Sequence, residues 1–143
     1  MISLLPVTAD NWKACANLAL AKHQQNFVPS NLYSIAEAQF YPQARSRAVY
    51  ADDDLVGYAL YGIEETTGHW KIFRLMIAEE FQGKGYGKAA MQVILEKLRL
   101  EGAKVVLVRY NLENDVATRL YQHFGFVEVG RTETHATAQC LLD

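Results

Sequence analysis

The segment best suited to chemistry is a glycine-rich loop, Gln82-Gly83-Lys84-Gly85-Tyr86-Gly87-Lys88. It lies between an apolar stretch that ends near Ala78 and a segment with helical periodicity. Three glycines in five residues allow a tight turn and a close approach of the backbone to a ligand. Backbone N–H groups at the start of a helix lack partners within the helix and attract anions. The loop therefore predicts an anion cradle, and a purely structural strand-to-helix turn is the alternative.

The spacing of the loop excludes two common phosphate-binding motifs. Gly83 is followed five residues later by Lys88, so no glycine stands where a Walker A loop, GxxxxGK followed by Ser or Thr, requires it. In the dinucleotide motif GxGxxG, counted from Gly83 and Gly85, the third glycine position also falls on Lys88. The loop therefore indicates neither a nucleoside triphosphate nor NAD.

Two ordered motifs carry a resemblance to a known family. Gln82-x-x-Gly85-x-Gly87 at the start of a helix resembles the Q/R-x-x-G-x-G/A signature of the GNAT (GCN5-related N-acetyltransferase) family. The downstream segment from Asn114 through Ala117 and Leu120 to Tyr121, followed by Phe124-Gly125-Phe126, is similar to that family's N-x-x-A-x-x-L-Y...G-F segment. The resembling parts cover Val49 to Val129. A narrower likeness, in Asn26–Asn31 with Ser34–Glu37, is to bacterial diamine and polyamine acetyltransferases of this family.

The resemblance implies a fold and a cosubstrate. The fold class is α/β, one N-acetyltransferase domain over residues 1–143, with a central mixed, mostly antiparallel sheet of six to seven strands and about four helices on both faces. Backbone N–H groups of the loop would hold the pyrophosphate of acetyl-CoA. The strand around Leu75, Met76 and Ile77 would splay from its neighbour and pair with the pantetheine arm. One N–H, near Met76 or Ile77, would stabilise the oxyanion.

Two further residues receive roles from the resemblance. Asn114 would contact the cofactor, and it is equally suited to cap a helix. Tyr121 would be the general acid for the departing thiolate, whereas its place on an apolar helical stripe would otherwise indicate a core residue. A phenol with a pKa of about 10 is a weaker acid than a thiol near 8.5, so Tyr121 would act mainly by hydrogen bonding in the transition state.

The implied reaction is direct transfer of the acetyl group to a primary amine, with a polyamine or diamine such as spermidine or spermine as the leading acceptor. Glu37 and Glu64 are the candidate substrate-binding residues, because carboxylates complement a polycation. The base that deprotonates the amine is open, with Glu37, Glu64, Glu65 and Asp52 as candidates by residue type. Other acceptors, such as an amino-sugar antibiotic or a protein N-terminus, and a non-catalytic acyl-CoA-binding module are the alternatives. The family resemblance also implies a homodimer.

Periodicity and turn residues predict the elements that must position these groups. We expect strands at Ile2–Val7, Ala48–Ala51, Leu55–Ile63, His69–Ala78 and Lys104–Tyr110, with one or two more between Val127 and Leu142. The sequence His135–Gln139 is a poor strand. One helix is expected after a cap at Thr8 or Asp10 and through Ala19, and a second from near Ser34. A third is expected from Ala90, with Gly102 beyond its end, and a fourth after an N-cap at Asn114, with Gly125 as its stop.

Composition limits the remaining function classes. The chain has 143 residues, of which 50% are hydrophobic, and 14 Lys and Arg oppose 16 Asp and Glu. A formal charge of -2 does not favour nucleic acid as a partner. The two cysteines and four histidines show no metal-ligand spacing. With no basic leader and no long apolar run, we expect a cytoplasmic protein with free thiols and no membrane partner.

Overall fold

The structure is a computed structural model that describes residues 1–22, 25, 27 and 29–143. Asn26 and Val28, which belong to the segment compared with polyamine acetyltransferases, lie outside the described residues. Within the described part, no helix is long and apolar enough to cross a membrane.

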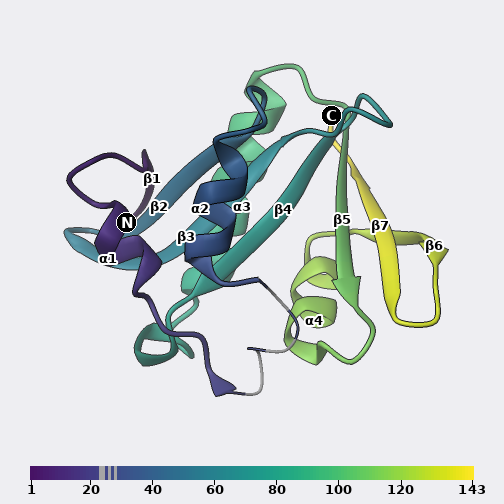
Figure 1. Ribbon diagram of the computed structural model, residues 1–143. Helices are drawn as coiled ribbons and strands as arrows, with labels where there is room; N and C mark the ends of the chain where they lie inside the picture. Colours follow the sequence, from purple (N-terminus) through teal and green to yellow (C-terminus); the bar gives the residue numbers. More distant parts are fainter. Residues whose placement is uncertain (23–24, 26, 28) are drawn as a thin grey trace.

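Seven strands form one mixed sheet in the order β1-β2-β3-β4-β5-β7-β6 (Figure 1). Only the neighbours β4 and β5 are parallel, and every other pair is antiparallel. This confirms the predicted mixed, mostly antiparallel sheet. The strands are β1 (Ile2–Pro6), β2 (Arg45–Ala51), β3 (Asp54–Ile63), β4 (Trp70–Ile77), β5 (Val105–Asn111), β6 (Val127–Arg131) and β7 (His135–Leu141).

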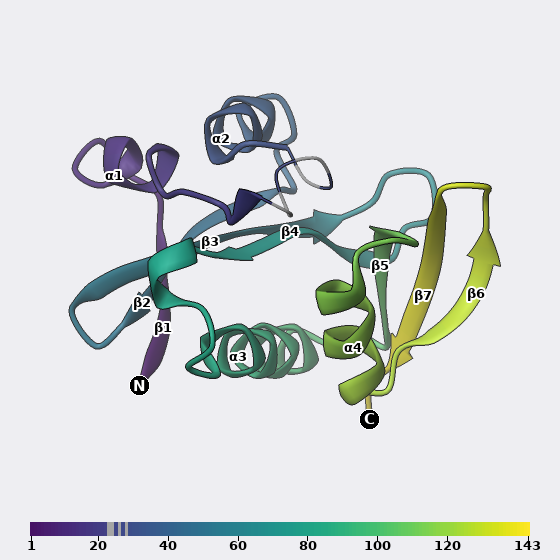
Figure 2. The ribbon, with the colours of Figure 1, turned by 90° about the horizontal axis from the view of Figure 1, so that it is seen from below.

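In the part of the chain that the structure describes, four α-helices cover the sheet on its two faces (Figure 2). The helices α1 and α2 lie on one face, and α3 and α4 lie on the other. The helices are α1 (Trp12–Ala16), α2 (Asn31–Ala38), α3 (Tyr86–Leu100) and α4 (Asp115–His123), with a short 3-10 turn, η2 (Glu79–Phe81), after β4.

The helix α3 shows why the predicted periodicity is reliable. Ala90, Met91, Ile94 and Leu98 are all buried in the main core, as a helical stripe requires. The helix begins at Tyr86, four residues before the stripe, because Gly85 adopts a left-handed conformation (φ 83°) and starts the first turn. The glycine loop therefore leads directly into α3.

The first two helices differ from the prediction. In α2 the Ser30 side chain accepts a hydrogen bond from the Tyr33 N–H at 3.1 Å, so the helix begins at Asn31 rather than near Ser34. The expected extension of α1 to Ala19 is wrong. The Ala19 carbonyl instead accepts the N–H of Glu79 at 2.8 Å, which ties this segment to the end of β4.

The expectation of a poor strand at His135–Gln139 is also wrong. These residues form most of β7, which pairs with β5 on one side and β6 on the other. Their small side chains suit this position, because Ala136 and Ala138 are buried against the core. Pairing on both sides and burial outweigh the low intrinsic strand preference of this sequence.

Candidate active site

The two parallel strands β4 and β5 pair over only three residues and then diverge (Figure 1). Pairing is confined to Trp70–Ile72 of β4. The β3 register shows that Phe73 is an extra residue in β4, since Arg74 lies opposite Leu60 and Ile72 lies opposite Tyr61. A bulge of this kind bends a strand and increases its twist. The bend falls where β4 leaves β5, and it opens a gap along the C-terminal half of β4.

Backbone alternation determines which groups of β4 face this gap. The Ala78 N–H donates to the Val56 carbonyl of the β3 segment at 2.8 Å, so it points away from the gap. Because successive residues of a strand point their N–H groups to opposite sides, the N–H groups of Ile77 and Leu75 face the gap and that of Met76 faces β3. Of the two predicted positions for an oxyanion donor, Ile77 therefore points into the gap and Met76 does not.

The glycine loop forms an open cradle next to this strand. Gly83 and Gly85 have φ values of 79° and 83°, and a side chain built on either residue would meet no atom within 4 Å. A side chain on Gly87 would lie 3.8 Å from the Cγ1 atom of Ile77, which places the loop against β4. The first hydrogen bond of α3 runs from the Ala89 N–H to the Gly85 carbonyl. The N–H groups of the helix that come before Ala89 therefore have no partner within the helix. An anionic group fits this open space beside N–H donors.

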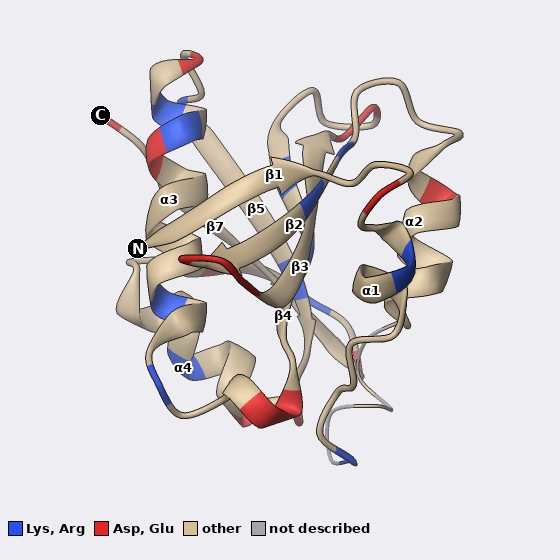
Figure 3. Ribbon diagram, turned by 90° about the vertical axis from the view of Figure 1, so that its left-hand side faces the viewer, with Lys and Arg blue, Asp and Glu red and all other residues tan. Residues whose placement is uncertain are grey.

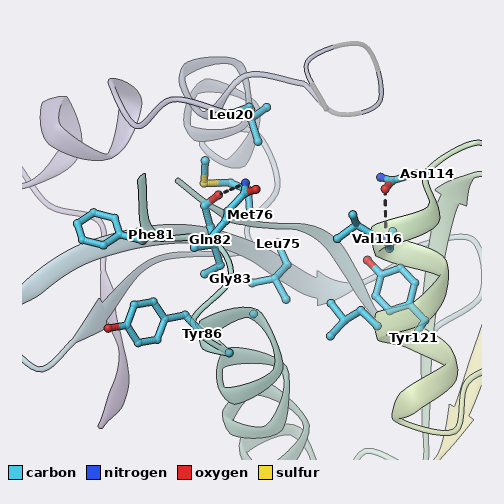
Figure 4. A pocket seen from close by; sticks show the side chains of 15 residues that line it. Leu20, Leu75, Met76, Phe81, Gln82, Gly83, Tyr86, Asn114, Val116 and Tyr121 are labelled. Atoms are coloured by element: carbon cyan, nitrogen blue, oxygen red, sulfur yellow. Dashed lines mark hydrogen bonds between the residues drawn. The ribbon is translucent and has the colours of Figure 1, made fainter. Parts of the chain in front are cut away.

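A cavity of about 310 Å³ lies between β4, the glycine loop and α4 (Figure 4). It is lined by Leu20, Leu75, Met76, Ile77, Phe81, Gln82, Gly83, Gly85, Tyr86, Gly87, Asn114, Val116, Ala117, Leu120 and Tyr121. The structure thus brings together ten of the twelve residues predicted for catalysis and cofactor binding. The other two, Lys84 and Lys88, are exposed beside the loop and do not line the cavity.

The side chain of Gln82, which begins the glycine motif, has a structural role inside this cavity. Its Nε2 atom donates to the Ile77 carbonyl at 2.9 Å. This bond lies on the gap side of β4, in agreement with the backbone alternation. The motif glutamine therefore fixes the loop to the end of the strand.

Asn114 is the N-cap of α4 and Tyr121 lies within this helix, on the far side of the cavity. The Asn114 side chain accepts the N–H of Ala117 at 3.1 Å and caps the helix. The Tyr121 ring packs 5.3 Å from that of Tyr110 and 5.5 Å from that of Phe126, measured between centroids. Its hydroxyl points toward the first turn of α4 (Figure 4).

The chemistry of Tyr121 follows from its burial. Burial, with a smaller contribution from Tyr110, raises the pKa of Tyr121 to about 12. The hydroxyl therefore stays protonated at neutral pH. No described residue forms a hydrogen bond with it, so the proton is available to a ligand in the cavity.

A second cavity, of about 390 Å³, lies on the α2 side of the sheet and brings together three of the four candidate carboxylates. Its wall includes Glu37, Glu64 and Glu65, with Phe73 and Arg74 contributed by β4. The strand β4 therefore contributes to both cavities. Phe73 and Arg74 belong to no sequence motif, so nothing in the sequence indicated their place here.

The carboxylates of this second cavity are not equivalent. Glu64 accepts hydrogen bonds from Lys71 at 2.7 Å and Thr67 at 3.0 Å, and the bond from Lys71 is the main cause of its lowered pKa. The Glu37 carboxylate lies 3.5 Å from Arg74 and accepts no hydrogen bond from any described residue. Glu37 therefore keeps hydrogen-bonding capacity that Glu64 has already used.

Asp52, the fourth candidate base, lines neither of these two cavities. It occupies the exposed turn between β2 and β3, at φ 53°, and its side chain accepts a hydrogen bond from the N-terminal ammonium group at 3.0 Å. Figure 3 shows this acidic turn in red at the ends of β2 and β3. Glu64 follows the opposite end of β3, about 30 Å away for a strand of this length. This placement removes Asp52 from the candidates for the base.

The sequence motifs did not indicate several apolar residues of the first cavity. Leu20 comes from the segment after α1, and Phe81 comes from the 3-10 turn after β4. Apolar residues in irregular segments have no spacing that distinguishes them from core residues. Among the described residues, no group of three or more His, Cys, Asp or Glu is placed to hold a metal ion.

The splayed strands β4 and β5, the glycine cradle and the protonated Tyr121 are features that suit an acyl-group transferase. Comparison with known proteins agrees with this class. Residues 12–126 match the Acetyltransferase (GNAT) family. The chain therefore belongs to the GNAT family of acetyltransferases. Spermine/spermidine N(1)-acetyltransferase of Bacillus subtilis (strain 168) is 30% identical over an alignment of 132 residues, and the alignment covers 87% of this chain and 87% of that protein.

Solved structures show the same fold at lower sequence identity. The spermidine N-acetyltransferase of Vibrio cholerae in complex with CoA and spermine has a TM-score of 0.77 and 19% identity, with 98% of this chain and 95% of that chain covered. An acetyltransferase from Salmonella typhimurium that modifies the N-terminal serine of ribosomal protein L7/L12 has a TM-score of 0.81 and 14% identity, with 99% and 95% covered.

Proposed function

We propose that this enzyme transfers the acetyl group of acetyl-CoA to a primary amine of a polyamine or diamine, such as spermidine or spermine. One observation carries the proposal. The strand β4 contributes to a cavity with a glycine cradle and a protonated tyrosine, and also to a cavity with three carboxylates. The 30% identity to a spermine/spermidine acetyltransferase supports the choice of acceptor.

The residues of the first cavity suit acetyl-CoA. The N–H groups that begin α3 would bind the pyrophosphate, since Gly83 and Gly85 leave space for it. The gap side of β4 would bind the pantetheine arm through backbone groups of Leu75 and Ile77, as an added strand. When bound, acetyl-CoA supplies a thioester carbonyl that is activated toward amines.

The chain's own groups would then assist the transfer. An N–H of Leu75 or Ile77 donates a hydrogen bond to the carbonyl oxygen as negative charge develops there. Tyr121 donates its hydroxyl hydrogen to the departing sulfur. Both groups have fixed positions before the reaction begins, because one belongs to the sheet and the other to a packed helix.

The second cavity would bind the acceptor. An ammonium group has a pKa near 10 and must lose a proton before it attacks the carbonyl. Glu37 is the better of the two predicted carboxylates for an ammonium group, because Lys71 and Thr67 already occupy Glu64. The amine would compete with Arg74 for Glu37.

A thiol-release assay tests the proposal. The protein is incubated with acetyl-CoA and one amine at a time: spermidine, putrescine, a lysine peptide, a peptide with a free N-terminus and an aminoglycoside. Release of CoA thiol with spermidine, several-fold faster in kcat/KM than with the other amines, is the expected result. Faster thiol release with another amine would make that amine the acceptor in place of a polyamine. CoA binding without thiol release would indicate a non-catalytic acyl-CoA-binding module.

The proposal includes a single N-acetyltransferase domain, a cytoplasmic location and a homodimer. Light scattering after size-exclusion chromatography tests the homodimer, and a mass near 16.1 kDa would indicate a monomer.

A further inference from the structure

Asn31 is a buried polar residue at the junction of three elements. It is the first residue of α2, and it is only 5% exposed. Its side-chain amide donates to the Cys15 carbonyl in α1 at 2.9 Å and to the Met76 Sδ atom of β4 at 3.4 Å. An amide nitrogen carries two hydrogens, and these two acceptors account for both. The side chain thereby ties α1, α2 and β4 together.

Met76 is the point at which this link meets the gap-facing strand. Beyond Ile72, β4 has no pairing with β5, so the β3 ladder and side-chain packing must hold its position. Met76 is 8% exposed and packs with Tyr58 and Leu60 on the face covered by α1 and α2. A shift of Met76 would move its neighbours Leu75 and Ile77, whose N–H groups face the gap.

We propose that Asn31 is a positioning residue for the acetyl transfer. By holding Met76, it fixes the backbone N–H donors of Leu75 and Ile77 in the place where the carbonyl oxygen gains charge. This role rests on the proposed function of those donors. Misplacement of a catalytic group by about 1 Å can cost about 10²-fold in rate, so loss of this link should lower kcat while substrate binding persists.

The test is the variant Asn31→Leu, which has a similar volume and no hydrogen-bond donor. We expect kcat to fall at least tenfold, with KM for acetyl-CoA and for spermidine within about twofold of wild type. The matched control is Ser34→Ala. Ser34 is buried on the same helix, one turn along, and its hydroxyl has no hydrogen-bond partner in the described part of the chain. The control should keep the wild-type kcat.

A second variant keeps the test decisive if Asn31→Leu does not fold. Met76→Leu removes the sulfur acceptor and roughly conserves volume, and it should also lower kcat. This variant is judged by kcat alone, because Met76 also lines the first cavity. In the double variant, the fall in kcat should be smaller than the product of the falls in the two single variants, because both substitutions break the same link.

The outcomes separate the two proposals. An active wild type with Asn31→Leu within twofold in kcat, or with a raised KM alone, would overturn the positioning role. If only Met76→Leu folds, an unchanged kcat overturns it equally. A wild type that releases no thiol with any amine would refute the proposed function, and the positioning role with it.

Discussion

Replacing Tyr121 with phenylalanine isolates the proton donor that we propose for the leaving group. The ring packs between Tyr110 and Phe126, and phenylalanine would keep these contacts. Since no described residue bonds to the hydroxyl, its removal breaks no hydrogen bond in that part of the protein. We therefore expect Tyr121→Phe to fold with nearly the wild-type free energy of unfolding, so that any loss of activity reports on chemistry.

The magnitude follows from the pKa of Tyr121, about 12. This value is about 3.5 pKa units above a thiol near 8.5, so complete proton transfer to the sulfur is uphill by about 5 kcal/mol. In the proposed role, Tyr121 therefore acts by hydrogen bonding as the carbon–sulfur bond breaks. General acids contribute about 10²- to 10⁴-fold, and a weak acid belongs at the lower end. We expect kcat to fall about 100-fold, equivalent to about 2.7 kcal/mol.

Steady-state thiol release at saturating acetyl-CoA and spermidine measures this loss. Calorimetric affinity for CoA should be unchanged, which distinguishes a chemical effect from a binding effect. The loss should shrink with an acyl donor whose thiol has a lower pKa, because a better leaving group needs less help. The wild-type kcat should also show no decline from Tyr121 ionisation below about pH 11, given its raised pKa. A kcat within twofold of wild type would show that Tyr121 is only a packing residue.

Three further perturbations test other parts of the structure. Gly85→Val fills the open cradle and should weaken CoA binding more than tenfold, as measured by calorimetry. The control is Gly68→Val, which carries similar backbone strain at φ 73° outside the cavity and should leave the affinity for CoA unchanged. Glu37→Gln should raise KM for spermidine several-fold, and wild-type kcat/KM should fall as salt rises; no salt dependence would argue against a charged acceptor site. Burial raises the pKa of the Cys15 thiol to about 11, so its contribution to stability is present below about pH 9 and is lost as pH rises to 11. In urea titrations in reductant, the wild type should lose about 3 kcal/mol more than Cys15→Ala over that range.

The sequence predicted those parts of the fold in which local pattern and tertiary role agree. The stripe of α3 is both helical in spacing and buried, and Asn114 is both a good cap and the start of α4. The order of strands and helices followed from such segments. The end of α1 was less predictable, because the Ala19 carbonyl bonds to the distant Glu79 N–H. The start of α2 depends on a local cap at Ser30, which the periodicity of the apolar residues does not reveal.

For the site, the sequence reveals residues whose spacing lies within one element. It does not reveal which residues of different elements lie close together. The glycine loop and Tyr121 are visible in the sequence because each lies within a short motif. The sequence does not reveal the roles of Phe73, Arg74 and Asn31. These roles depend on a bulge in β4 and on a buried contact between residues 45 positions apart. The orientation of the N–H groups likewise required the register of β3 against β4.

The site depends on an interruption of regular sheet structure. A strand that loses its partner leaves N–H and C=O groups without the usual bonds, which is costly when they are shielded from water. Here Gln82 satisfies the Ile77 carbonyl, while the N–H groups of Leu75 and Ile77 face the gap. Gly57 of β3 allows the opposite side of β4 to pack closely, because a side chain there would lie 2.3 Å from the Met76 carbonyl oxygen. The strand is thus held firmly by β3 and left open toward α4. A ligand that extends along β4 would complete the sheet with the same groups that recognise it, so the stability of this strand and the affinity for the ligand are thermodynamically linked.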